Sequence, residues 1–104
     1  MEPTDEVRIV AEQLKHLATT ALRAINEEND ILLAEVLDLR EPLLQVLHDY
    51  AAEAPDLILA CPLVHDAARL ELKVAAAARL RRDDLYNKWV SVRNRAALAN
   101  AYAN

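Results

Sequence analysis

The chain has 104 residues, contains no glycine and no phenylalanine, and carries a net charge of −5 at pH 7. A chain of this length forms one domain with a small core. The lack of glycine excludes glycine-dependent motifs such as the phosphate loop and the dinucleotide fingerprint. Because alanine and leucine dominate, we expect an all-α fold in a single domain over residues 1–104.

The sequence indicates a cytoplasmic protein. Its one cysteine, Cys61, cannot form an intramolecular disulfide, which favours a reducing compartment. The N-terminal stretch is acidic, "MEPTDEVRIV", where a signal peptide would be basic and then apolar. The apolar run "LILACPLV" is interrupted by Pro62 and falls far short of the ~20 residues of a membrane helix. We therefore expect no membrane insertion.

The first predicted helix spans about residues 4–40. Thr4 followed by Asp5 and Glu6 is typical of a helix start, because acidic residues favour the positive end of the helix dipole. From Ile25 onward, apolar residues recur at alternating steps of four and three, which predicts a helix seam. Asn29 is the polar member of this seam, where it would fix the register or the partner. The predicted seam consists of Ile25, Asn29, Leu32, Val36, Leu39, Leu43, Val46 and Tyr50.

Prolines divide the rest of the chain. Pro42 predicts a kink or break, so we expect a separate short helix over about residues 42–53. Pro55 and Pro62 bound a turn region over residues 54–62, and a long helix follows over about residues 62–103. One apolar stripe of this helix is centred on Leu70, and a second contains Trp89. The predicted architecture is an elongated antiparallel helical hairpin or three-helix bundle. Dimerisation or a partner helix is expected, because so long a helix needs packing.

Charge is distributed unevenly along the chain. Residues 1–60 hold 13 acidic and 4 basic residues, whereas residues 61–104 hold 4 acidic and 8 basic residues. The basic half raises nucleic-acid binding as an option, but the overall acidity argues against it. We expect a protein partner instead, because tryptophan, tyrosine and arginine are enriched at protein interfaces. A packing role for Trp89 in the bundle core remains open. The predicted partner-binding residues are Leu85, Tyr86, Trp89, Val92 and Ala96.

The candidate chemistry is sparse. His16, His48 and His65 lie on different segments, and Cys61 with His65 supplies at most two ligands, so no metal site and no cofactor are expected. The stretch "HLATTALRAI" resembles the phosphoaccepting box of sensor kinases through His16, Leu22 and Ile25. This leaves a helical-hairpin phosphotransfer or dimerisation module centred on His16 as one alternative. A generic coiled-coil scaffold is another, and none of the favoured interpretations is an enzyme.

A broader resemblance covers residues 17–54 and continues into the last helix. The segments that carry it are "INEENDILL", "LREPLLQVLHDY" and "VRNRAALANAYAN". Their order and spacing resemble the FlgN-type flagellar export chaperones, although that family usually has a Glu-Lys pair where this chain has Pro42 and Leu43. The resemblance implies a bacterial type III secretion chaperone. It would bind helical C-terminal segments of hook-associated proteins at the hook–filament junction and keep them soluble before export.

Overall fold

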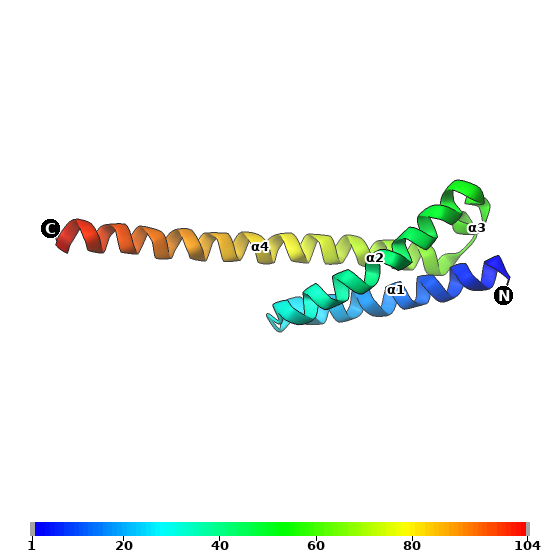
Figure 1. Cartoon of the computed structure of the whole chain (residues 1–104), viewed down its shortest axis with the longest axis horizontal. Coiled ribbons are helices and arrows are strands. Elements are labelled where there is room, and N and C mark those ends of the chain that lie inside the picture. Colours follow the sequence, from blue (N-terminus) through cyan, green and yellow to red (C-terminus); the bar gives the residue numbers. More distant parts are fainter. Residues whose placement is uncertain (1, 104) are drawn as a thin grey trace.

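The structure, a computed structural model, describes residues 2–103, with side chains described through residue 101. The described part contains the helices α1 (Pro3–Asn26), α2 (Asp30–Glu53), α3 (Pro55–Leu59) and α4 (Pro62–Ala103). These residues form an elongated molecule measuring 72 × 23 × 18 Å, in which α1 and α4 lie roughly along the long axis and α2 crosses them obliquely (Figure 1). The expected all-α, elongated architecture with long helices at both ends is confirmed.

α1 is the central helix and packs against both α2 and α4. α2 runs antiparallel to α1, and α4 runs in the same direction as α1 (Figure 1). Ala18 and Ala21 of α1 form one buried cluster with Val36 of α2 and Val74 of α4. The small side chains on α1 allow its neighbours to approach closely. The buried residues of α1 are Val7, Val10, Ala11, Leu14, Ala18, Ala21 and Ala24.

The expected helix over residues 4–40 is broken by a turn, and this expectation was wrong. α1 ends at Asn26, and Glu28 adopts a left-handed backbone conformation with φ 56°. Asn29 then caps α2, because its side-chain oxygen accepts a hydrogen bond from the Leu32 amide at 3.0 Å. Asp30 follows in the first turn, where a negative charge favours a helix start. The reversal lets the two halves of the predicted helix pack on each other and bury their apolar faces.

The predicted break at Pro42 does not occur. α2 runs without interruption over Asp30–Glu53 and contains Pro42. A proline inside a helix costs about 3 kcal/mol, because it removes a hydrogen bond and crowds the preceding turn. Leucine and valine side chains of α2 pack against the core on both sides of Pro42 and hold the helix together. The separate short helix expected over residues 42–53 is therefore the second half of α2.

The residues of the predicted seam do not form one continuous packed face in the structure. Ile25 belongs to the end of α1, and Asn29 lies in the turn as a helix cap and not as a seam residue. Leu39 is 62% exposed and faces away from the core. Tyr50 is half-buried, and its hydroxyl donates a hydrogen bond to Glu6 of α1. The seam residues that do pack in the core are Leu32, Val36, Leu43 and Val46.

The predicted turn region over residues 54–62 contains the short helix α3, and α4 then begins at Pro62, as expected. The first part of α4 packs on α1, with Ala67 and Val74 buried. Arg81 forms ion pairs with the α1–α2 turn, and the helix then continues alone past this turn (Figure 1). We call residues 82–103 the arm and residues 2–81 the body. No described helix combines the length and apolar character that a membrane crossing requires.

Candidate protein-binding site

The arm exposes large apolar side chains along its length. In residues 82–101, every side chain except the half-buried Val90 is exposed. The exposed fractions are 43% for Leu85, 55% for Trp89 and 62% for Val92. A helix of this kind gains little stability from its own sequence, and most helices in proteins depend on packing of an apolar face. The arm therefore has an apolar face that lacks packing within the single described chain.

The five residues predicted to bind a partner all lie on the arm, and all are exposed: Leu85, Tyr86, Trp89, Val92 and Ala96. The alternative in which Trp89 fills the bundle core does not hold within the single chain. Leu98 is also exposed, at 58%. It lies on a different side of the helix from Trp89 and is therefore not part of the predicted partner-binding stripe.

The apolar face of the arm continues the face through which α4 packs on the body. Val74 is the last buried residue among the side chains of α4 that the structure describes, and Leu85 follows it by 11 residues, which is three helical turns. Leu85 therefore lies on the same side of α4 as Val74. A partner bound to the arm would occupy the space beyond the α1–α2 turn, in line with the body (Figure 1).

Three side chains form an exposed cluster at the middle of the arm. The ring centroids of Tyr86 and Trp89 lie 6.2 Å apart with the planes tilted by 36°. The guanidinium carbon of Arg93 lies 5.5 Å from the centroid of Trp89. This cation–π contact contributes about 0.5–1 kcal/mol at an exposed position and orients the indole ring. Tyrosine, tryptophan and arginine together are typical of the residues that dominate binding at protein interfaces.

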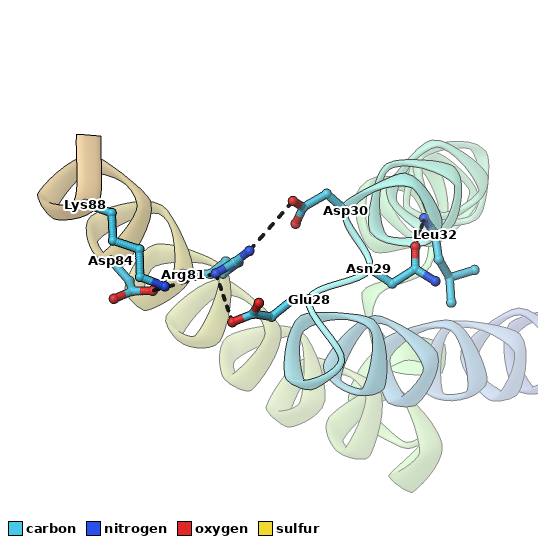
Figure 2. A network of polar contacts seen from close by, with 7 residues as sticks. All are labelled: Glu28, Asn29, Asp30, Leu32, Arg81, Asp84 and Lys88. Carbon is cyan, nitrogen blue, oxygen red and sulfur yellow. Dashed lines mark hydrogen bonds and ion pairs between the residues drawn. The ribbon is translucent and has the colours of Figure 1, made fainter. Parts of the chain in front are cut away.

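A polar network holds the base of the arm against the α1–α2 turn (Figure 2). The side chain of Arg81 is only 14% exposed, and its Nη1 atom lies 3.3 Å from Oε1 of Glu28. Its Nη2 atom lies 3.8 Å from Oδ2 of Asp30, and Nη1 lies 3.6 Å from Oδ2 of Asp84. Lys88 extends the network through a 3.1 Å contact with Asp84. The acidic turn thus fixes the point at which α4 leaves the body.

A second ion pair ties α2 to α4 inside the body. Nη1 of Arg40 lies 3.0 Å from Oε2 of Glu71, and both side chains are mostly buried. Together with the Arg81 contacts, this pair aligns α4 on the body along its packed length. The direction of the arm is therefore set by the body and not by the arm itself.

A groove runs between α1 and α2 and was not predicted from the sequence. Its larger hollow, of about 620 Å³, is lined by residues that include Leu17, Leu39 and Leu43. A smaller hollow, of about 220 Å³, lies between the same helices where Tyr50 meets Glu6. We call both hollows together the α1–α2 groove. The position of Leu39 in the heptad pattern predicts burial. In the structure, the turn at residues 26–29 folds α2 back onto α1, and Leu39 stays exposed.

The histidines are dispersed in the structure. His16 is exposed and borders the larger hollow of the groove. His65 lies on α4, and its Nε2 atom is 3.0 Å from the carbonyl oxygen of Leu59. Among residues 2–103, no group of three or more His, Cys, Asp or Glu side chains is arranged to hold a metal ion.

Comparison of the chain with family models, with curated proteins and with solved structures finds no match.

Proposed function

We propose that this protein is a non-catalytic chaperone that binds an amphipathic helix of a client along its arm. The observation that carries the proposal is the arm itself, in which Leu85, Trp89 and Val92 are exposed on one side of an otherwise unpacked helix. An amphipathic helix is the simplest partner for such a surface, because it can pack its own apolar stripe lengthwise against the arm.

The charge of the arm indicates which clients fit best. Residues 85–103 contain Lys88, Arg93 and Arg95 and no acidic residue. A client helix with acidic residues beside its apolar stripe would match this surface, and complementary charge favours the correct partner and faster association. Burial of Trp89 would then supply much of the binding free energy, as buried tryptophans do at other interfaces.

The resemblance to FlgN-type chaperones supports a specific form of the proposal. In this form, the protein acts in the bacterial cytoplasm, and its clients are the helical C-terminal segments of hook-associated proteins. Binding would cover the apolar stripe of the client and keep the client soluble until type III export. A helix that projects beyond its own body supports this role, because a client helix can approach it without displacing the core.

The proposal is tested with synthetic peptides that reproduce the helical C-terminal segments of hook-associated proteins. Trp89 is the only tryptophan, so its fluorescence reports directly on the arm. We expect a blue shift on binding and a loss of binding in Trp89→Glu and Val92→Asp variants. The matched control is Leu72→Asp, because Leu72 is 72% exposed on the same helix but belongs to the body. Equal binding by Val92→Asp and wild-type protein, measured by calorimetry, would refute the proposal.

A variant of His16 distinguishes the chaperone from the phosphotransfer alternative. A His16→Gln chaperone should bind the peptides as well as the wild-type protein does, because His16 lies on α1 and not on the arm. A phosphotransfer module would instead lose phosphorylation by a phosphodonor in this variant. Incorporation of phosphate at His16 in the wild-type protein, without peptide binding, would favour the alternative.

A further inference from the structure

We infer that two copies of this chain exchange arms, so that the arm of each copy lies in the α1–α2 groove of the other. The occupant of the groove is thus the arm of a second copy. As an association of two chains, the inference stands independently of any client. Arm exchange would also regulate client binding, because it covers the arm until a client binds. This regulatory role rests on the proposed function.

The charges of the two surfaces are complementary. The arm carries four basic and two acidic residues, and the two acidic ones, Asp83 and Asp84, lie at its base, so residues 85–103 carry three basic residues and no acidic residue. Within the described part of the chain, the two hollows of the groove are lined by four carboxylates and by no lysine or arginine. The carboxylates belong to Glu6, Glu12, Asp49 and Glu53. Opposite charges on facing surfaces steer association and disfavour arrangements that bring like charges together.

The apolar parts also match. The floor of the larger hollow is formed by Leu17, Leu39 and Leu43, and Leu39 is 62% exposed in the single chain. The arm carries Trp89 and Val92 on one side, with both exposed. Each surface is an apolar strip with charged flanks, so pairing them removes apolar area from water on both sides.

The arm is long enough to cover the groove. The arm contains 22 residues and is ~33 Å long at 1.5 Å per residue, whereas α1 and α2 contain 24 residues each and are ~36 Å long. The residues that line the groove extend over positions 6–17 of α1 and 39–53 of α2, which is ~17–21 Å, so the arm is long enough to cover the whole groove. In place there, it packs on α1 and α2, whose residues line the groove, and adds a further helix to the body.

The direction of the arm allows each copy to place its arm in the groove of the other at the same time. The apolar face of the arm lies on the same side of α4 as Val74, so a second body can sit beyond the α1–α2 turn, in line with the first. If that second body points the opposite way, its own arm returns along the first body. The two contacts are then related by a two-fold axis, and the assembly closes as a dimer.

The test measures mass by light scattering coupled to size-exclusion chromatography at about 100 μM protein, a concentration at which a micromolar dimer is nearly fully formed. The wild-type protein is expected at twice its chain mass of 11.6 kDa. Trp89→Asp in the arm and Leu39→Asp in the groove should each weaken dimerisation by about 1,000-fold or more, because a two-fold dimer contains the substitution twice and each copy places a carboxylate in an apolar contact. Both positions are exposed in the single chain, so both variants should keep the helical content of the wild-type protein, and Leu72→Asp should remain dimeric.

Mixing the two monomeric variants gives a signature specific to arm exchange. In a mixed dimer, the intact arm of Leu39→Asp meets the intact groove of Trp89→Asp, so one of the two contacts is restored. We expect a mixed dimer that neither variant forms alone. If the arms instead pair with each other, Leu39→Asp stays dimeric, which would overturn the inference. A monomeric wild-type protein would overturn it as well.

The same proteins separate this inference from the proposed function. Leu39→Asp leaves the arm intact and uncovered, so it should bind the client peptides at least as tightly as the wild-type protein. A monomeric wild-type protein that binds the peptides would refute arm exchange alone. A dimer that exchanges arms but binds no peptide would refute the chaperone proposal alone.

Discussion

The Nη1 atom of Arg81 lies 3.3 Å from Oε1 of Glu28 and joins the base of the arm to the turn between α1 and α2. These two residues are 53 positions apart in the chain. Their contact lies at the base of the arm, where α4 passes the turn (Figure 2).

Substituting Arg81 should loosen the base of the arm. Arg81→Ala removes a mostly buried guanidinium and its contacts with Glu28 and Asp30, whose carboxylates stay exposed to water. We expect the free energy of unfolding to fall by about 1 kcal/mol, because the carboxylate partners are solvated and such pairs are individually weak. Urea denaturation measures the change. The control is Arg82→Ala, whose side chain is 75% exposed and should have almost no effect. Equal losses in the two variants would contradict the role given to Arg81.

Removing the cap of α2 should destabilise the α1–α2 turn. Asn29→Ala loses the 3.0 Å hydrogen bond from the Leu32 amide, and a lost cap costs about 1 kcal/mol. Asn29→Asp keeps an oxygen at the same position, so it should retain most of the wild-type stability. Thermal unfolding followed by circular dichroism distinguishes the two. If alanine and aspartate were equivalent at position 29, the side-chain cap would contribute nothing.

Tyr50 should make stability depend on pH at alkaline values. Its hydroxyl donates a hydrogen bond to Glu6, and this bond raises the pKa of Tyr50 above its ordinary value of 10.0, with burial and the charges of Glu6 and Glu53 as smaller causes. The fold thus favours the protonated tyrosine. The resulting stabilisation is fully present below pH 10.0 and disappears as the pH rises through the raised pKa.

Tyr50→Phe removes this stabilisation, so the wild-type protein should be more stable than the variant below pH 10.0 and lose that advantage above it. Urea denaturation at a series of pH values measures the difference. Glu6→Ala should reproduce the effect, whereas Glu12→Ala, on the same helix but outside this contact, should not. A difference between wild type and Tyr50→Phe that stays constant across the alkaline range would show that the hydrogen bond has no such linkage.

Amide hydrogen exchange in the arm should depend on what covers it. The arm is the unpacked end of α4, and helical stability in proteins comes mostly from packing, so an uncovered arm frays from its free end and exchanges quickly. Amides of residues 85–101 should therefore become more protected as protein concentration rises, while amides at the centre of α1 should not change. Mass spectrometry of peptic fragments reports both regions. Protection of the arm that is strong and independent of concentration and of client would contradict an arm that needs a partner.

The general architecture could be predicted because it depends on patterns close together in the sequence. The apolar spacing around Leu70 and around Trp89 indicated one long C-terminal helix, and α4 spans Pro62–Ala103. The same spacing singled out Leu85, Trp89 and Val92 as one stripe, and the structure leaves all three exposed. Periodicity identifies an apolar face, but it does not say whether that face meets the core or water.

The turn at residues 26–29 was missed because two signals conflicted. The heptad spacing passes through Asn29 without interruption, and the chain has no glycine to mark a turn. Asn29 followed by Asp30 is a helix-start signal, and it was present in the sequence. The left-handed conformation of Glu28 costs roughly 1–2 kcal/mol for a residue other than glycine. Packing of α1 on α2 offsets this cost, and that contribution cannot be seen in a local stretch of sequence.

By itself, the sequence determined that the chain is helical, that its last helix is long, and which side chains share a stripe on that helix. These properties follow from intrinsic propensity and from the 3.6-residue period, which act within a few turns. Only the tertiary structure decided that α1 reverses at residues 26–29, that α2 continues through Pro42, and that α4 leaves the body at Arg81. Each of these depends on the free energy of packing between distant segments, which outweighs a strained turn residue or a helical proline. The same packing leaves Trp89 exposed to solvent and forms the acidic α1–α2 groove on the body.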